Sequence, residues 1–162
     1  MLIEACRLGP VLDLACGYGR HSLAAARLGL PVLALDRDEK ALRSLQRSAP
    51  PRIQCVRTDL EAGSGIPVAP ASCGAILVFR FLFRPLAPAI VEALRPGGLL
   101  LYETFTIRQR DLGQGPRNPA FLLDPNELAR LFSSLQVIAY EEVTSEGPPA
   151  EALARLVARK SP

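Results

Sequence analysis

The eight residues 13–20 have the sequence DLACGYGR, and they decide the fold. They overlap an apolar run predicted to be a strand, residues 11–15, and lead into an amphipathic stretch predicted to be a helix. Gly17 and Gly19 stand at the turn between the two, where glycine lets the backbone approach a ligand closely. The stretch therefore predicts an α/β fold with a ligand at the carboxyl end of its first strand.

Short apolar runs alternate with amphipathic stretches along the rest of the chain, which is typical of parallel strands joined by crossover helices. The expected strands are residues 11–15, 31–35, 53–56, 75–81, 99–105 and 136–143, and the expected helices are residues 20–28, 38–48, 85–94 and 124–132. Asp38 is predicted to cap the second helix, and Asp124 followed by Pro125 to start the fourth. Residues 59–72 are expected to be mostly loop, and the spacing in residues 151–160 fits a helix or a strand.

Length and composition favour one domain over residues 1–162, because 49% hydrophobic content is ample for a single core. The apolar runs end long before the roughly 20 residues that cross a bilayer, and residues 1–10 lack the pattern of a signal peptide. We therefore expect a cytoplasmic protein without a membrane partner. The cysteines and the single histidine lack metal-ligand spacing, so no metal is expected. A net charge of +3 is too weak to indicate a nucleic-acid partner, although nothing in the sequence excludes one.

Two carboxylates accompany the glycine loop. Asp13 lies four residues before Gly17, and Asp36 ends the next strand about 20 residues further on, where a ribose diol is bound in this architecture. Ser22 occupies the third glycine position of the dinucleotide pattern, and Asp13 would repel a pyrophosphate but suits an ammonium and a sulfonium. The loop therefore favours S-adenosylmethionine over NAD. Each acid also has a structural interpretation, Asp13 as an acceptor for loop amides and Asp36 as a helix cap.

Residues 13–20 resemble the first motif of class I S-adenosylmethionine-dependent methyltransferases. With Arg20 directly after the second glycine, the motif is also similar to that of the tellurite-resistance-type (TehB-like) small methyltransferases. The general resemblance continues in order through Asp36, TDL at residues 58–60 and LRPGGL at residues 94–99. It implies a Rossmann-like methyltransferase fold, with a mostly parallel seven-stranded sheet, helices on both faces and a C-terminal antiparallel hairpin.

The same resemblance assigns roles to particular residues. It implies that Gly17 and Gly19 border the methionine part of the cofactor, and that Asp36 holds the ribose hydroxyls. The full cofactor-binding set that we predict is Asp13, Ala15, Gly17, Gly19, Asp36, Arg37, Asp59, Leu60 and Phe79, in which Arg37 flanks the adenine while Asp59 and Leu60 meet its amino edge and its face. It also makes residues 152–159 the last strand of the hairpin. Asp59 could alternatively start a turn, and His21 is expected to be a solvated residue on the first turn of a helix rather than a catalytic base.

Methyl transfer from a sulfonium is an in-line displacement, which an enzyme accelerates chiefly by aligning the acceptor with the methyl group. We expect Arg80 to position the acceptor, because a charge at the end of such an apolar strand needs a partner. Five arginines are predicted to converge at the acceptor mouth, namely Arg80, Arg84, Arg108, Arg110 and Arg117. They lead to the hypothesis of a small anionic acceptor, the alternative being that most of them are solvated. The tellurite-resistance-type resemblance hints instead at a thiol or chalcogen acceptor.

The acceptor site is expected to need a cover. The first strand begins at residue 11, so the N-terminal helices that cap this site in similar enzymes are not expected. The irregular residues 106–123 are a candidate lid, and a second subunit in a homodimer is the alternative. Three further functions stay open beside transfer to a small molecule: a non-catalytic S-adenosylmethionine-binding or partner-binding module, an RNA methyltransferase, and an NAD-linked oxidoreductase, which Ser22 and Asp13 disfavour.

Overall fold

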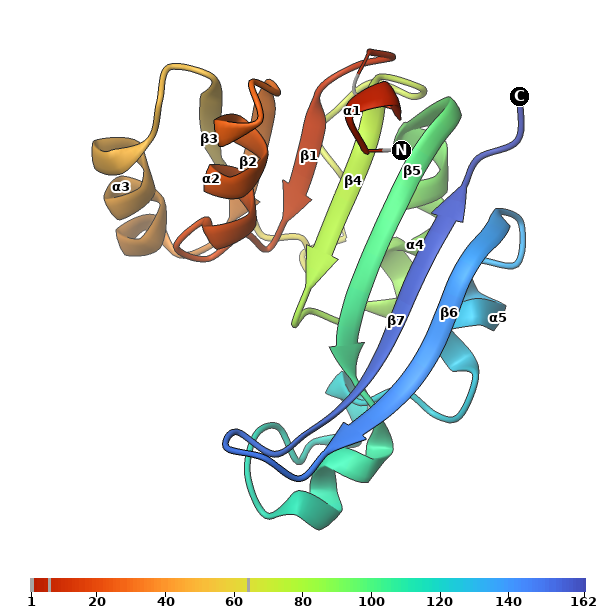
Figure 1. Ribbon diagram of the computed structural model, residues 1–162. Coiled ribbons are helices and arrows are strands. Elements are labelled where there is room, and N and C mark those ends of the chain that lie inside the picture. Colours follow the sequence, from red (N-terminus) through yellow and green to blue (C-terminus); the bar gives the residue numbers. More distant parts are fainter. Residues whose placement is uncertain (1, 6, 64) are drawn as a thin grey trace.

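The computed structural model describes residues 2–5, 7–63 and 65–162. Its strands form one seven-stranded sheet in the order β3-β2-β1-β4-β5-β7-β6 (Figure 1). The strands are β1 (Val11–Leu14), β2 (Val32–Asp36), β3 (Ile53–Arg57), β4 (Cys73–Phe79), β5 (Leu94–Phe105), β6 (Gln136–Ser145) and β7 (Glu151–Arg159). The helices are α1 (Leu2–Ala5), α2 (Arg20–Arg27), α3 (Glu39–Ser48), α4 (Ala87–Ala93) and α5 (Glu127–Leu131). None of the described helices is long and apolar enough to cross a membrane.

Strands β1 to β5 pair in parallel, whereas β7 pairs antiparallel with both β5 and β6. This topology confirms the predicted Rossmann-like methyltransferase fold and its C-terminal hairpin. Residues 151–160, whose spacing fits a helix or a strand, contain the strand β7. This strand lies between β5 and β6, and its Leu156 pairs with Tyr102 on one side and with Tyr140 on the other. The backbone hydrogen bonds of these neighbours decide the structure where local spacing fits both alternatives.

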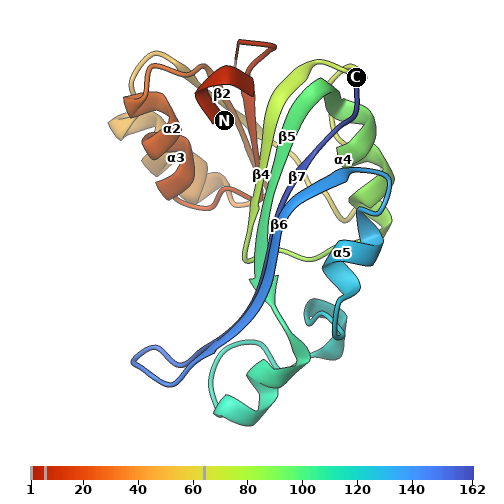
Figure 2. The same ribbon diagram turned by 45° about the vertical axis from the view of Figure 1, so that its right-hand side comes forward.

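Helices cover both faces of the sheet. Figure 2 shows α2 and α3 on one side, and α4 and α5 on the other. Adjacent residues of β1 face opposite layers, so that Val11 packs with α2 in one core cluster and Leu12 packs with the α4 side in the other. Both are fully buried, which explains why the central parallel strands have continuous apolar sequences.

Several element boundaries differ from the prediction. β4 ends at Phe79 instead of residue 81, because Arg80 has a left-handed backbone with φ of 59° and ends the strand. β5 begins at Leu94 instead of residue 99 and contains an irregular register near Ala75 of β4. The helix expected at residues 85–94 is a 3-10 turn, η1 (Arg84–Leu86), followed by α4.

The two predicted helix caps have opposite outcomes. Asp38 caps α3 as predicted, since its side chain accepts hydrogen bonds from the amides of Lys40 and Ala41. Asp124 does not cap α5. The cap position is Asn126, which has a left-handed backbone, and the amide of Asp124 donates to the carboxylate of Glu127. The first turn of α5 is therefore ordered by its own glutamate instead of by the preceding aspartate.

Residues 106–123 are ordered by two short 3-10 turns, η2 (Ile107–Leu112) and η3 (Pro119–Phe121), and their ends meet in a β-bridge between Thr106 and Leu123. The buried side chain of Gln109 ties this segment to β7 by accepting a hydrogen bond from the amide of Ala152 (2.8 Å). The segment lies beyond the end of β5, at the edge of the sheet toward which β1 and β4 also point (Figure 1).

Candidate functional site

The carboxyl ends of β1, β2, β4 and β5 enclose two adjoining cavities of about 450 and 550 Å³. Both cavities are lined by Ala15, Arg80 and Phe105, so they form one continuous cleft across the switch point of the sheet. In a doubly wound α/β sheet this crevice is where ligands bind. We call the smaller the first cavity and the larger the second cavity.

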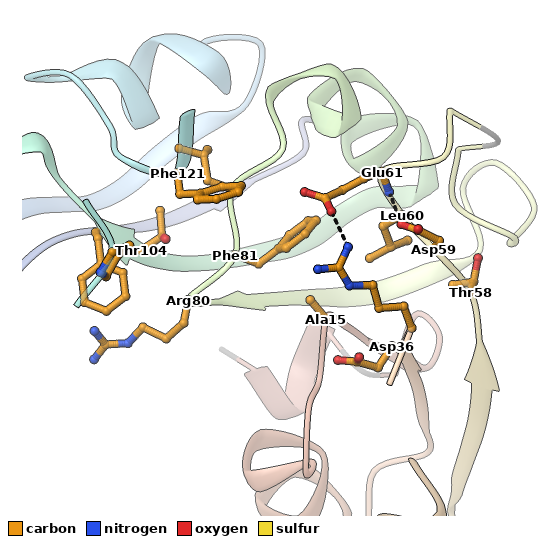
Figure 3. A pocket seen from close by; sticks show the side chains of 14 residues that line it. Ala15, Asp36, Thr58, Asp59, Leu60, Glu61, Arg80, Phe81, Thr104 and Phe121 are labelled. Carbon is orange, nitrogen blue, oxygen red and sulfur yellow. Dashed lines mark hydrogen bonds and ion pairs between the residues drawn. The ribbon is translucent and has the colours of Figure 1, made fainter. Parts of the chain in front are cut away.

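The first cavity combines polar and apolar side chains from the ends of several strands. Figure 3 shows Ala15 and Asp36 along one side, and Leu60, Phe81 and Phe121 along the other. The remaining lining residues are Arg37, Thr58, Asp59, Glu61, Arg80, Leu82, Thr104, Phe105 and Pro116. Such a mixture of apolar walls and a few polar groups is typical of small-molecule sites.

Asp36 joins the glycine loop to the end of β2. Its Oδ2 accepts a hydrogen bond from the amide of Gly17 (2.7 Å), and its Oδ1 accepts one from the amide of Asp38 (2.8 Å). The cap of α3 is Asp38, so the alternative that Asp36 caps this helix is not what the structure shows. Each carboxylate oxygen can accept a further hydrogen bond, and Asp36 lines the first cavity.

The two glycines of the loop lie in different surroundings. Gly17 has a φ of 54°, lines the second cavity and faces open space where a Cβ would stand. Gly19 has a φ of 76°, and a Cβ there would lie 2.5 Å from two methyl carbons of Leu45. Gly19 is buried and is not among the lining residues of either cavity, so it serves the packing of α2 against α3.

Asp13 lies beneath the loop, only 2% exposed, and lines the second cavity. The hydroxyl of Ser22 donates a hydrogen bond to its Oδ2 (2.5 Å). Burial raises the pKa of Asp13 to about 6, against the opposing effect of the Ser22 hydroxyl. Asp13 is therefore a satisfied structural acid that also lines a cavity, and its role toward the cofactor stays a prediction.

The predicted adenine residues Arg37, Asp59 and Leu60 all line the first cavity. Leu60 is buried there, while Asp59 is exposed and accepts a hydrogen bond from the amide of Glu61 (2.9 Å) through Oδ1, as in a turn. Arg37 forms an ion pair with Glu61 (2.8 Å), which Figure 3 marks with a dashed line. Phe79, the last residue of the predicted cofactor-binding set, lines the second cavity.

The predicted convergence of five arginines is wrong. Arg80 alone among them lines the cleft described here. Arg84 binds Glu127 and the carbonyls of Ala120 and Leu122, while Arg117 donates to the carbonyl of Gly113. Arg108 and Arg110 are exposed. The other four arginine side chains are therefore exposed or engaged in structural contacts outside the cleft.

Arg80 has the partners that its position at the end of an apolar strand requires. Its Nη2 lies 2.9 Å from Glu151 and 3.4 Å from Glu103, and its guanidinium carbon lies 4.6 Å from the centre of the Phe105 ring. Its Nη1 is buried without a hydrogen-bond partner. Two carboxylates already pair with Nη2, which leaves only Nη1 for a ligand and weakens the case for an anionic acceptor.

His21 is not the solvated residue that the sequence predicts. Its ring stacks on Phe79 with a centroid separation of 3.7 Å and an interplanar angle of 8°, and it lines the second cavity. Its Nε2 is buried without a hydrogen-bond partner. Burial, followed by the charge of Arg20, lowers the pKa of the imidazole, so the neutral form is favoured.

Comparison with known proteins shows to which protein family the chain belongs. Residues 11–98, more than half of the chain, match the family model described as a methyltransferase domain. The chain belongs to this methyltransferase-domain family. The match runs from the start of β1 to the irregular start of β5, and so includes the glycine loop, Asp36 and Asp59.

Individual proteins similar to this chain are also methyltransferases. The chain is 40% identical over 101 residues to a ribosomal protein L11 methyltransferase of Dechloromonas aromatica, a match that covers 60% of this chain and 31% of the relative. The chain thus spans about a third of the curated relative it matches. Among solved structures, TehB from Haemophilus influenzae aligns with a TM-score of 0.79 and 22% identity, over 99% of this chain and 61% of that one. An S-adenosylmethionine-dependent methyltransferase from Mesorhizobium loti aligns with a TM-score of 0.76 and 20% identity, over 97% and 96%.

The family predicted from residues 13–20 and the later motifs is thereby confirmed, and S-adenosylmethionine is the cofactor expected of this methyltransferase domain. The cleft fits that cofactor. Gly17 leaves open space beside the carboxylate of Asp36, which suits a ribose diol, and Asp13 offers a negative charge further along.

Sequence reasoning missed several residues that line the cleft. Glu151 comes from β7, 71 residues after Arg80, and carries no local signal. Phe81 and Phe121 line the first cavity from the segments after β4 and within η3. His21 carried a usable signal, because it follows the glycine loop directly and therefore begins a helix at the ligand-binding edge.

Proposed function

We propose that this domain transfers a methyl group from S-adenosylmethionine to a small-molecule acceptor. The observation that carries the proposal is the continuous cleft, in which two cavities share Ala15, Arg80 and Phe105. Each cavity has a volume within the roughly 300–1,000 Å³ of typical ligand sites. The cleft thus offers room for a cofactor beside a second small ligand.

The cofactor side of the proposal follows the ends of β1, β2 and β3. Asp36 accepts hydrogen bonds from the ribose hydroxyls while it keeps the amide of Gly17 in place. Leu60 covers one face of the adenine, with Arg37 at its flank and Asp59 at its amino edge. Ala15, Gly17 and Phe79 border the methionine part, and Asp13 faces its ammonium group.

Bound S-adenosylmethionine supplies a methyl group on a positively charged sulfur. The residues of this chain contribute alignment and exclusion of water, which suffices for an in-line displacement. Arg80 is the positioning residue at the junction of the cavities, where Glu103, Glu151 and Phe105 fix its side chain. Because that charge is balanced, an uncharged thiol fits the acceptor end better than an anion.

Residues 106–123 supply the cover of the acceptor in this proposal, and the domain needs no second subunit for it. Pro116 and Phe121 support this role because both line the first cavity. The contacts of Arg84 with the carbonyls of Ala120 and Leu122 hold Phe121 in position.

A protein acceptor is the second candidate, favoured by the 40% identity to a relative named as a ribosomal protein L11 methyltransferase. The two candidates are separated by offering radiolabelled S-adenosylmethionine with small thiols in one series and with isolated ribosomal proteins in another. Label in the thiol product alone supports the proposal, and label in protein alone replaces it with the second candidate.

Calorimetry with S-adenosylmethionine, S-adenosylhomocysteine and NAD tests the cofactor first. We expect both sulfur ligands to bind and NAD not to bind. Binding of NAD alone would overturn the proposal. Binding of the sulfur ligands without turnover across thiols, proteins and RNA would favour a non-catalytic binding module.

A further inference from the structure

Two residues that line the second cavity each carry a buried nitrogen with no hydrogen-bond partner among the described residues. The two nitrogens are Nε2 of His21 and Nη1 of Arg80. Buried nitrogens are normally hydrogen-bonded, and leaving one unpaired is costly, so each such atom requires an explanation. Here the two lie on residues of one cavity, which points to a shared ligand group.

The second cavity carries charges of both signs. Asp13 and Glu151 supply carboxylates, whereas Arg20 and Arg80 supply guanidinium groups. An anion alone would meet the two carboxylates, and a cation alone would meet the two arginines. A zwitterion satisfies both sets, because its positive end can face an acid while its negative end accepts from the unpaired nitrogens.

The neighbouring cavity indicates which zwitterion this is. The amide of Gly17 is bonded to Asp36, so the ribose position of the first cavity is adjacent to the loop that lines the second. The methionine part of S-adenosylmethionine extends from the ribose and ends in an ammonium and a carboxylate. Its reach from Asp36 past Gly17 therefore leads into the cavity that holds His21 and Arg80.

We propose that His21 Nε2 and Arg80 Nη1 bind the carboxylate of the methionine part of the cofactor. This inference rests on the proposed function. His21 is the more specific anchor, because Arg80 also holds Glu103 and Glu151. The ring of His21 is fixed by its stack on Phe79, so its nitrogen is oriented before the ligand arrives.

The test measures affinity, by calorimetry, for two ligands that differ in one group. S-adenosylhomocysteine carries the carboxylate, whereas its decarboxylated analogue S-adenosyl-3-thiopropylamine keeps the ammonium and lacks the carboxylate. The variant His21→Phe keeps an aromatic ring against Phe79 and removes both nitrogens. Arg108→Ala is the matched control, since Arg108 is exposed and lines neither cavity.

We expect His21→Phe to raise the Kd for S-adenosylhomocysteine about tenfold, as for the loss of a charge-assisted hydrogen bond. The Kd for the decarboxylated analogue should stay unchanged, and Arg108→Ala should alter neither. In the unsubstituted protein the analogue should bind at least about tenfold more weakly than S-adenosylhomocysteine, a comparison that needs no variant to fold.

Equal weakening of both ligands by His21→Phe would assign His21 a merely structural role and overturn the inference. Equal affinity of the unsubstituted protein for the two ligands would overturn it as well, while leaving the proposed function intact. Failure of the unsubstituted protein to bind either ligand would overturn the proposed function and the inference together.

Discussion

The two ends of the cleft are built in different ways. The proposed cofactor end comes mainly from one stretch of chain, residues 13–60, whose parts are joined by contacts such as the hydrogen bond from the amide of Gly17 to Asp36. The proposed acceptor end depends on side chains from distant strands, because Arg80, directly after β4, pairs with Glu103 of β5 and Glu151 of β7. A local motif can therefore specify the methyl donor while leaving the acceptor undetermined.

The largest effect is expected at Gly19, which supports the cofactor end by packing. Gly19→Ala places a methyl group against Leu45 in a left-handed backbone, which should lower the free energy of unfolding by about 2–5 kcal/mol. Gly29→Ala is the matched control, because Gly29 has a similar φ of 80° and no neighbour within 4 Å. Denaturant titration measures both, and equal losses would show that the contact with Leu45 has no role.

The second effect concerns the contact that unites the cofactor end. Asp36→Ala removes the acceptor for the ribose and the anchor of the Gly17 amide, so the Kd for S-adenosylhomocysteine should rise about 100-fold. Asp38→Ala controls for the helix cap, since it should cost about 1 kcal/mol of stability without changing the affinity. Calorimetry checks the affinity, and an unchanged Kd for Asp36→Ala would remove Asp36 from the site.

These contacts also show why the gathering of Asp13, Gly17 and Asp36 at one edge of the sheet was predictable. DLACGYGR places Asp13 and Gly17 on one strand end, and the parallel neighbour β2 must bring Asp36 to the same edge. His21 follows directly on this loop, yet its stack on Phe79 depends on β4 lying next to β1. The position was available from the sequence, but the contact was a property of the assembled sheet.

The contacts of Arg80 were not predictable because they join residues of distant strands. Arg84 and Arg117 looked alike in the sequence. In the structure Arg84 binds Glu127 and a backbone carbonyl, and Arg117 binds a different backbone carbonyl. Glu151 meets Arg80 because β7 inserts between β5 and β6, which no spacing within residues 151–160 encodes. The positions of the five arginines, after β4 and within residues 106–123, therefore predicted a convergence that the fold does not form.

The third effect tests the cost of burying an acid at the cofactor end. Burial raises the pKa of Asp13 from 3.8 to about 6, so the folded state holds its proton more tightly than the unfolded chain. This acid therefore lowers stability as the pH rises from about 4 to 6, by roughly 3 kcal/mol in full, and the loss persists above that window. Asp13→Asn should recover roughly 2 kcal/mol at pH 7.5 and flatten the pH dependence of unfolding between pH 4 and 6.

Thermal unfolding over that pH range provides the measurement for Asp13. Ser22→Ala is the companion variant, because it removes the hydroxyl that donates to the carboxylate and should destabilise the protein at neutral pH. The expected gain for Asp13→Asn comes with weaker binding of S-adenosylhomocysteine, since the ammonium loses its partner. A variant that is less stable at pH 7.5 would contradict the assigned cost of burial.

The fourth effect lies at the acceptor end and should be smaller. Arg84→Ala releases Glu127 and the carbonyls of Ala120 and Leu122, which should cost about 1 kcal/mol because the side chain is one-third exposed. Residues 106–123 should then be cleaved faster in limited proteolysis. Arg43→Ala, which removes an exposed pair on α3, should leave the cleavage rate unchanged. Unaltered cleavage in Arg84→Ala would show that other contacts, such as those of Gln109, hold the cover alone.

The smallest effect distinguishes the two descriptions of the acceptor end most directly. Arg108 and Arg110 are exposed and line neither cavity. Replacing either by alanine should change the KM for the acceptor by no more than about twofold. The free energy of unfolding should change by no more than about 0.5 kcal/mol. Steady-state kinetics with a thiol and with a small carboxylate compares an uncharged acceptor with an anion. A tenfold rise in KM for the carboxylate alone would mean that the loop arginines reach the acceptor during turnover, and the distant contacts of Arg80 would then no longer define that end of the cleft.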